Sequence, residues 1–353
     1  PIFNLSSGAI MRRNSSSDEI LSRIVLLGKT GAGKSSLANI IFGEELFTIN
    51  STFNSGTGQC QSETKSINGR NITLIDTPGF FDTDRSEEEL KPEIVRCITE
   101  CAPGPHAFLI VLKVERFTEQ EQAVVTKICQ YFSEDALKYA VVVFTHGDQL
   151  PEGMKIQEFV HQNKNLSDLV KKCGGRCHVV DDKNWRNNKG DAYRNNQFQV
   201  AELLNTLDKM TEANQGKCYT NEMLQAVQRE IQRKEECIRQ SSGNMSLEEI
   251  RNNAKMSVYD MLMIRSAGCA TGALLGALLG VADMVKHFQD LSQVLATIGE
   301  GQKVASAALS GVVSGGAIGF NASEGAETPM EAIQKAANAV WNQSGFSADQ
   351  KNK

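Results

Sequence analysis

The chain has 353 residues, and its 37 Lys and Arg against 42 Asp and Glu give a net charge of −5 at pH 7. This slight excess of acid provides no basic surface for nucleic acid, and the length suits two or three domains. Nine scattered cysteines favour reduced thiols in the cytosol over a disulfide framework. Cys97 with Cys101, and Cys173 with Cys177, have a loose zinc-like spacing, but packing in a core is the favoured interpretation.

The first elements of the chain are a polar tail, a strand and a helix. Residues 1–20 are rich in serine, and we expect them to be disordered; the proline at position 1 favours a processed or truncated end. Ser22–Leu27 has the composition of a short buried strand, and Ser35–Phe42 that of a helix. Gly43 is placed to cap the end of this helix.

The loop between this strand and this helix reads G-K-T-G-A-G-K-S, from Gly28 to Ser35, which fits the phosphate-binding loop pattern. Such a loop points backbone N–H groups and the positive end of the helix dipole at an anion, and glycine lets the backbone come close. We expect Lys34 to reach the β- and γ-phosphates of a nucleotide and Ser35 to hold Mg²⁺. The predicted nucleotide contacts in this region are Gly28, Thr30, Gly31, Ala32, Gly33, Lys34, Ser35 and Ser36.

Two further strands are expected at Glu63–Ile67 and Asn71–Ile75, joined by Asn68-Gly69, a pair that favours a type I′ hairpin turn. The second strand runs into Asp76-Thr77-Pro78-Gly79. An acidic residue at this strand end lies level with the phosphate loop and can bind the waters around Mg²⁺. We therefore expect Asp76 at the metal and both Asp76 and Gly79 at the nucleotide.

A buried strand at Ala107–Leu112 precedes a capping box, Thr118–Glu121, that opens a helix running to Phe132. The next strand, Tyr139–Thr145, ends in Thr145-His146-Gly147-Asp148. The Asp148 carboxylate can accept from N1–H and from the N2 amino group of guanine, whereas adenine has no matching pair of donors. We therefore expect Thr145, His146 and Asp148 to contact the nucleotide. His146 stands where a lysine is usual, and the alternative for Asp148 is a helix N-cap.

The last predicted strand is Arg176–Asp181. Asp181, Asp182, Asn184 and Trp185 follow and could flank the base, although an aromatic ring in a loop is more often a packing anchor. A helix over Asn196–Met210 closes this part of the chain. The alternation of strands and helices predicts an α/β domain with a doubly wound, mostly parallel sheet.

The C-terminal third is predicted to be helical. Gly216–Met261 is expected to form one or two charged amphipathic helices. Ser266–Ala282 and Val304–Phe320 carry no charge and contain glycines spaced four apart; a last helix begins at Thr328. Two interpretations remain open, a membrane-inserting hairpin and a soluble helical pair against the α/β domain, because each run is shorter than the roughly 20 apolar residues of a span.

These residues together resemble the GTPases of immunity-associated proteins, the GIMAP family, relatives of septins and of the chloroplast import receptors. The resemblance spans roughly Ile24–Leu224 and implies a GTPase G domain that binds GTP or GDP with Mg²⁺. Its last base-contacting motif departs from the family pattern, since it has Asp181 and Asp182 where asparagines are usual. The stretches that carry it are G-K-T-G-A-G-K-S-S, D-T-P-G-F-F-D, A-P-G-P-H-A-F-L-I-V-L, E-R-F-T-E-Q-E-Q, F-T-H-G-D, C-G-G-R-C-H and Y-T-N-E-M-L.

The resemblance also implies two catalytic residues. Thr57, with Thr52 as its competitor, matches a loop threonine that closes over Mg²⁺ and the γ-phosphate. Arg116 matches an arginine that acts in trans when two G domains pair across the nucleotide. Small GTPases orient the attacking water with a glutamine, but Phe80 occupies that position here, so intrinsic hydrolysis is expected to be slow.

Two functions therefore compete. The first is an immune-type switch that hydrolyses GTP slowly and is stimulated by forming a homodimer or a higher oligomer. The second is a GTP-gated scaffold on an intracellular membrane with negligible hydrolysis; an ATPase or kinase is disfavoured by the guanine-type motif. The expected location is cytoplasmic or peripheral on an intracellular membrane. The expected segments are a tail at 1–20, the G domain at 21–213, an amphipathic helical segment at 214–264 and an Ala/Gly-rich helical tail at 265–353.

Overall fold

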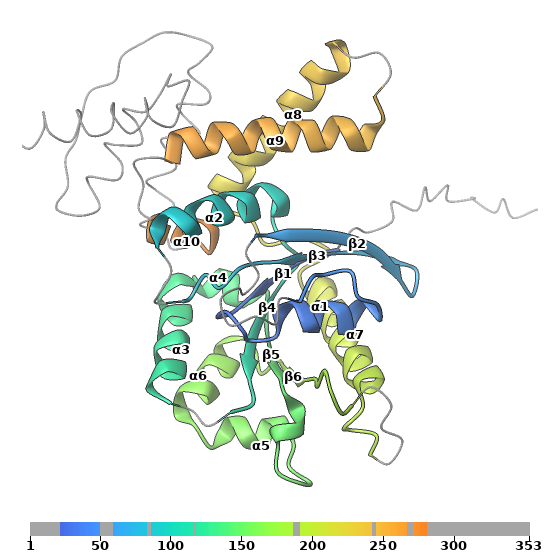
Figure 1. Cartoon of the computed structure of the whole chain (residues 1–353), viewed down its shortest axis with the longest axis vertical. Coiled ribbons are helices and arrows are strands. Elements are labelled where there is room, and N and C mark those ends of the chain that lie inside the picture. Colours follow the sequence, from blue (N-terminus) through green and yellow to red (C-terminus); the bar gives the residue numbers. More distant parts are fainter. Residues whose placement is uncertain are drawn as a thin grey trace, which may run out of the picture.

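The computed structural model describes residues 22–49, 59–82, 86–115, 118–185, 191–241, 245–266 and 271–280. Its centre is a six-stranded sheet with strand order β2-β3-β1-β4-β5-β6 (Figure 1). Only β2 is antiparallel to its neighbour, so the prediction of a doubly wound, mostly parallel sheet is confirmed. The strands are β1 (Ser22–Leu27), β2 (Gln61–Ile67), β3 (Arg70–Asp76), β4 (Ala107–Lys113), β5 (Ala140–Thr145) and β6 (Cys177–Val179).

Helices cover both faces of the sheet (Figure 1). On one face lie α1 (Lys34–Phe42) and α7 (Asn196–Ala213). The helices on the other face are α2 (Glu87–Cys101), α3 (Glu119–Tyr131), α4 (Glu134–Leu137), α5 (Ile156–His161) and α6 (Lys164–Lys172). A short 3₁₀ helix, η1 (Gly147–Gln149), follows β5.

The central strands are apolar on both sides because both sides are covered. In β4, Phe108 and Ile110 pack under α2 and α3, while Leu109 and Val111 face α1 and α7. Strand β5 alternates in the same way, and all six of its residues are buried. This explains why the sequence of these strands reads as a continuous hydrophobic run.

The turn between β2 and β3 has the geometry that its sequence predicts. Asn68 and Gly69 have φ values of 51° and 76°, as a type I′ turn requires, and Ile67 pairs with Arg70 across it. The predicted strand at Arg176–Asp181 is shorter in the structure, where β6 has three residues. Val180 continues alongside β5 through a backbone bond to Phe144, but Asp181 already belongs to the following loop.

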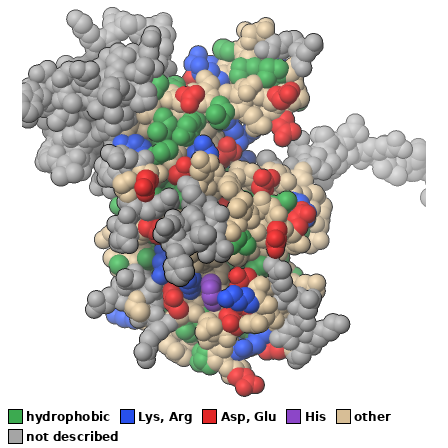
Figure 2. Space-filling view, viewed as in Figure 1, with side chains coloured by type: hydrophobic (Ala, Val, Ile, Leu, Met, Phe, Trp, Pro, Cys, Tyr) green, Lys and Arg blue, Asp and Glu red, His purple; other side chains and the backbone are tan. Residues whose placement is uncertain are grey.

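Three more helices, α8 (Glu222–Ser241), α9 (Leu247–Arg265) and α10 (Thr271–Leu278), pack on α2 (Figure 1). Their buried side chains belong to the same hydrophobic core as those of α2 and β4. The described helices after residue 213 therefore share a core with the α/β domain. Figure 2 shows hydrophobic side chains gathered around α9, whereas acidic and basic side chains are interspersed over the rest of the visible face.

The first glycine-rich run does not form one long helix in the part that the structure describes. Helix α10 has eight residues and is followed by Gly280 with φ of 84°. Leu274, Leu275 and Leu278 are buried, which agrees with the interpretation of a helix against the α/β domain. Among the described residues, no helix has the length and apolar character needed to cross a membrane. The second run, the helix expected from Thr328, and the tail at 1–20 lie outside the described residues.

Candidate functional site

The phosphate loop connects β1 to α1 at the carboxyl edge of the parallel strands. Gly31 and Gly33 have φ values of 74° and 84°, which side chains rarely adopt. A Cβ on Gly28 would lie 2.5 Å from the carbonyl oxygen of Val111, and one on Gly33 would lie 3.0 Å from Cγ2 of Thr145. The loop is therefore pressed against the ends of β4 and β5, and only glycine fits at these positions.

Two side chains at the start of α1 take up the geometry that the loop pattern predicts. Lys34 is buried, and its Nζ donates to the carbonyl oxygens of Gly28 at 3.2 Å and Lys29 at 3.0 Å. Ser35 Oγ donates to Oδ2 of Asp76 at 2.5 Å, and Asp76 is fully buried at the end of β3. The structure thus brings together Ser35 and Asp76, which the sequence assigns to one metal site from positions 41 residues apart.

The segment after β3 also contacts the phosphate loop, in a way that the sequence analysis did not foresee. The backbone N–H of Thr30 donates to Oδ1 of Asp82 at 2.8 Å. A Cβ on Gly79 would lie 2.5 Å from Oγ1 of Thr30, so Gly79 does lie at the loop. Asp82 was detectable as a second acid in D-T-P-G-F-F-D. Its role depends on the path of the chain beyond Gly79, which no local pattern reveals.

Phe80 and Phe81 lie in the hydrophobic core, with exposed fractions of 4% and 0%. Both rings point away from solvent and pack in the same core as residues of α2. The position that carries a glutamine in small GTPases is therefore occupied here by a buried ring. This geometry gives the residue no means of holding a water molecule.

The end of β5 is bonded directly to the phosphate loop. Thr145 Oγ1 donates to the carbonyl oxygen of Ala32 at 2.8 Å, and His146 Nδ1 lies 3.0 Å from the same hydroxyl. Because the hydroxyl hydrogen points to Ala32, we infer that His146 Nδ1 carries the proton in this pair. His146 has a left-handed φ of 58°, which turns the chain into η1 and places Asp148 in the first turn.

The loop after β6 is organised around Asp181. Its Oδ2 accepts from the backbone N–H groups of Lys183 at 3.2 Å and Asn184 at 2.5 Å. Asn184 Nδ2 in turn donates to Oδ2 of Asp148 at 3.3 Å. Burial raises the pKa of Asp181 above its ordinary value, and the nearby Asp148 carboxylate raises it further. Asp181 therefore shapes the loop beside Asp148 rather than facing a ligand.

Trp185 is a packing anchor, as the alternative interpretation had it. Its side chain is 2% exposed, and a Cβ on Gly147 would meet its ring at 2.6 Å. The ring also lies 6.4 Å from that of Tyr193, edge to face. With both contacts made inside the protein, this ring is held beneath η1 and is not presented to a ligand.

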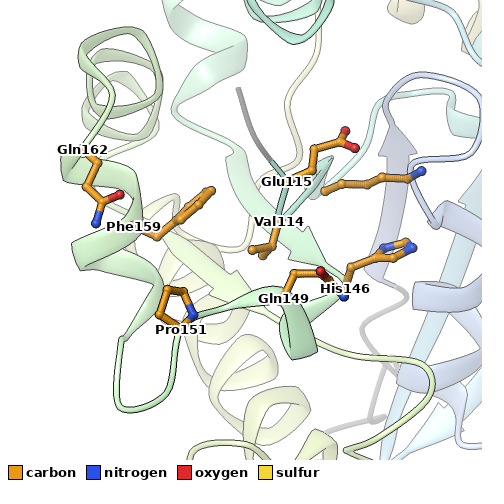
Figure 3. A pocket seen from close by; sticks show the side chains of 8 residues that line it. Val114, Glu115, His146, Gln149, Pro151, Phe159 and Gln162 are labelled. Atoms are coloured by element: carbon orange, nitrogen blue, oxygen red, sulfur yellow. The ribbon is translucent and has the colours of Figure 1, made fainter. Parts of the chain in front are cut away.

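A cavity of about 460 Å³ opens beside His146 (Figure 3). Figure 3 shows Glu115 and His146 at one side of it and Pro151, Phe159 and Gln162 at the other. Glu115 forms an ion pair with Lys29 of the phosphate loop at 3.4 Å, so the cavity borders the loop. The full lining is Lys113, Val114, Glu115, His146, Gln149, Pro151, Phe159 and Gln162.

Several predicted residues are not placed. Arg116, Thr57 and its competitor Thr52 lie outside the described residues, so their roles remain predictions.

Both cysteine pairs are buried in the core, and burial raises the pKa of Cys173 to about 12 and that of Cys177 to about 11. Within the described ranges, no cluster of His, Cys, Asp and Glu has the geometry of a metal site.

Comparison with known proteins relates most of the chain to one family. Residues 22–238 match the AIG1 family. Immune-associated nucleotide-binding protein 9 of Arabidopsis thaliana is 32% identical over 251 residues, which are 69% of this chain and 71% of that protein. Human GTPase IMAP family member 8 is 31% identical over 199 residues, 56% of this chain, but the match spans only 29% of that longer protein.

Among solved structures, Toc33 from Arabidopsis thaliana in complex with GDP and Mg²⁺ aligns with a TM-score of 0.44 and 20% identity, over 56% of this chain and 86% of that one. The family match covers more than half of the chain. It contains the phosphate loop, Asp76 and the segment from Thr145 to Trp185. The chain therefore belongs to the AIG1 family.

Proposed function

We propose that the chain binds GTP and GDP with Mg²⁺ and hydrolyses GTP slowly to GDP and phosphate. The observation that carries this proposal is the buried Ser35–Asp76 pair beneath a glycine loop that is bonded through Thr145 to the Asp148 segment. The residues proposed to contact the phosphates, the metal ion and the base are thereby connected to one another by hydrogen bonds. Relatives of this chain named as nucleotide-binding proteins and as a GTPase support the same conclusion.

The residues present fit a magnesium ion. Mg²⁺ takes oxygen ligands, and the Ser35 hydroxyl and the buried Asp76 carboxylate lie together at the phosphate loop, as oxygen groups around such an ion would. Asp76 would hold waters of the ion from behind, and Thr57 is proposed as the third protein contact. When bound, the ion would offset the negative charge of the β- and γ-phosphates.

Slow hydrolysis is proposed because the chain has no side chain at the glutamine position that can orient water. Phe80 is buried there. We propose that Arg116 of a second copy compensates, because a guanidinium near the bridging oxygen stabilises the charge that develops in the transition state. Glu115, the residue before Arg116 in the sequence, is ion-paired to Lys29 of the phosphate loop, which supports this proposal.

A GTP-gated scaffold with negligible hydrolysis remains the second candidate. The buried Phe80 favours it, and so does the packing of α8, α9 and α10 on α2, the helix that follows the Asp76–Asp82 segment. In this version, the nucleotide would control assembly through α2, and the intracellular membrane would be reached through the C-terminal tail.

Nucleotide binding is tested by titrating fluorescent GDP with and without Mg²⁺, with ATP as a competitor. We expect Ser35→Ala to lose most of the Mg²⁺-dependent part of the affinity, whereas the control Ser66→Ala, at an exposed serine near the hairpin end of β2, should keep it. The proposed site would be contradicted if ATP displaced fluorescent GDP as effectively as GTP does, or if the two substitutions lowered the Mg²⁺-dependent affinity equally.

The two candidates are separated by measuring GTP turnover per molecule over a wide range of protein concentration, with sedimentation alongside. If pairing stimulates hydrolysis, the turnover of the wild type should rise with concentration as a dimer forms. The turnover of Arg116→Ala should not change with concentration, although this variant should still bind GTP. Turnover near zero at every concentration, together with GTP-dependent assembly, would support the scaffold instead.

A further inference from the structure

One cation reaches the phosphate loop from outside the predicted motifs. Lys113 is the last residue of β4 and lies in register with Thr145 of β5. Its Nζ lies 4.0 Å from the position that a Cβ on Gly31 would take. The ammonium group of Lys113 is therefore next to the middle of the loop, in the wall of the cavity that also contains His146.

The backbone around Lys113 is fixed by the neighbouring strand. The N–H of Val114 donates to the carbonyl oxygen of Thr145 at 2.9 Å, and Thr145 Oγ1 also lies within bonding distance, 3.3 Å, of the carbonyl oxygen of Leu112. Thr145 is itself bonded to Ala32 in the phosphate loop. The base of the Lys113 side chain is thus held in place relative to the loop by three contacts that do not involve its charge.

Lys113 differs from Lys29 and Lys34, the two lysines of this loop, in the interactions of its ammonium group. Lys29 is paired with Glu115, and Lys34 is bonded to two loop carbonyls. In the described part of the chain, no carboxylate lies within ion-pair distance of Lys113 Nζ, although the side chain is half-buried. A half-buried cation beside an anion-binding loop is stabilised when an anion occupies the loop.

The segment after β5 does not itself provide a lysine beside the phosphate loop, because His146 occupies that position. It occupies the position where guanine-binding motifs usually have a lysine, and its Nδ1 is directed to Thr145 rather than to the loop. We propose that Lys113 binds the phosphate chain of the nucleotide beside Gly31 and supplies, from β4, the positive charge that the β5 motif lacks. This assignment rests on the proposed nucleotide binding and adds one residue to it.

The test is calorimetric titration of GDP, GMP and guanosine, each with Mg²⁺, into the full chain. We expect Lys113→Gln to weaken GDP binding about 10-fold or more, the range for one charge-assisted hydrogen bond, and to change guanosine binding little. Lys113→Arg should recover most of the GDP affinity. The matched control is Lys155→Gln, an exposed lysine before α5, which should bind like the wild type.

A second pair of variants tests whether Lys113 and the missing motif lysine are equivalent. His146→Lys installs a cation directly after β5, so we expect it to restore GDP affinity in the Lys113→Gln background and to add little in the wild type. Urea unfolding of each variant checks that the fold is intact.

The outcomes distinguish this inference from the function on which it rests. If the wild type binds no guanine nucleotide, the proposed function fails. If the wild type binds GDP and Lys113→Gln binds it equally well, or loses GDP and guanosine affinity by the same factor, the role assigned to Lys113 is wrong.

Discussion

Two glycines with left-handed φ values allow the cost of backbone strain to be separated from the cost of steric crowding when alanine replaces glycine. Gly33 has φ of 84°, and a Cβ on it would lie 3.0 Å from Thr145 Cγ2, whereas Gly153 has φ of 74° and a Cβ on it would meet open space. We expect Gly153→Ala to lower the free energy of unfolding by about 1–2 kcal/mol through backbone strain alone. Gly33→Ala should cost more and abolish GDP binding, because the new methyl group displaces Thr145 from the loop. Urea denaturation and GDP titration measure both effects; equal losses with unchanged binding would contradict the close packing described for Gly33.

His106 should make the protein sensitive to mild acid. Its Nδ1 accepts from the backbone N–H of Arg23 at 3.1 Å, which requires the neutral ring. Burial, and to a lesser extent the charge of Arg23, lower the pKa of His106 to about 4. Between pH 6.5 and 4 the unfolded chain therefore binds a proton that the folded chain does not, so stability falls as the pH falls through this window, by up to about 3 kcal/mol.

The measurement is the free energy of unfolding in urea at pH 7.5 and at pH 5 for the wild type and for His106→Asn. The variant keeps a side-chain acceptor for Arg23 but cannot titrate, so its loss of stability between the two pH values should be smaller. Burial also lowers the pKa of His178, so the variant should keep part of the slope. An identical slope in both proteins would rule out His106 as a source of the acid sensitivity.

At the scale of single residues, the sequence predicts site residues where a side chain leaves the end of a strand. Asp76 and Asp148 were predicted in this way because parallel strands bring their carboxyl ends to one edge, whereas Ser35 was predicted from the phosphate-loop pattern. The proximity of Lys113 to Gly31 was not predicted although Lys113 also ends a strand, since no motif contains this lysine and its reach depends on the register between β4 and β5. Asp82 was missed because its contact with Thr30 is made by a turn without a local signature.

At the scale of elements, Asn221 joins the start of α8 to the end of α10. Its Oδ1 accepts from the backbone N–H of Leu224 at 3.0 Å, as an N-cap does, and its Nδ2 donates to the carbonyl oxygen of Ala277 at 2.7 Å. We expect Asn221→Asp to keep the cap and lose the bridge, because a carboxylate has no donor. Hydrogen exchange should then speed up in α10 but not in α8.

Asn221→Ala removes both bonds and should accelerate exchange in both helices, with a loss of about 1–2 kcal/mol in the free energy of unfolding. Asn252→Ala, an exposed position inside α9, is the control and should leave both helices unchanged. If Asn221→Asp protects α10 as well as the wild type does, then the bond to Ala277 does not hold that helix.

Helices were predicted less completely than strands. The type I′ turn, the central strands and α1 were predicted to within one or two residues, because turn glycines and apolar runs are local signals. The sequence analysis did not predict α2, whose start is crowded with acidic residues and which contains Pro92. The amphipathic character of α8 was predicted but its contact with α2 was not, because an apolar stripe does not identify the surface that it covers.

At the scale of the whole molecule, the helical segment after residue 213 is joined to the α/β domain by charge as well as by apolar packing. Lys255 of α9 forms an ion pair with Glu100 of α2 at 2.7 Å, and Arg96 lies 5.5 Å from the ring centre of Tyr259. Buried residues of α8 and α9 share the core of β4. We therefore expect the α/β domain and helices α8 and α9 to unfold as one cooperative unit.

Nucleotide binding provides a test of whether the α/β domain and helices α8 and α9 unfold together. A ligand that binds only the folded chain raises the free energy of unfolding by about 2.7 kcal/mol at 100 times its dissociation constant, and all amides that exchange through the same global opening gain that protection. GDP with Mg²⁺ should therefore slow exchange in β4 and in α9 by the same factor, although α9 lies on α2 away from the phosphate loop. Protection that rises in β4 but not in α9 would show that the helices open independently, and that α2 transmits nothing from the nucleotide to them.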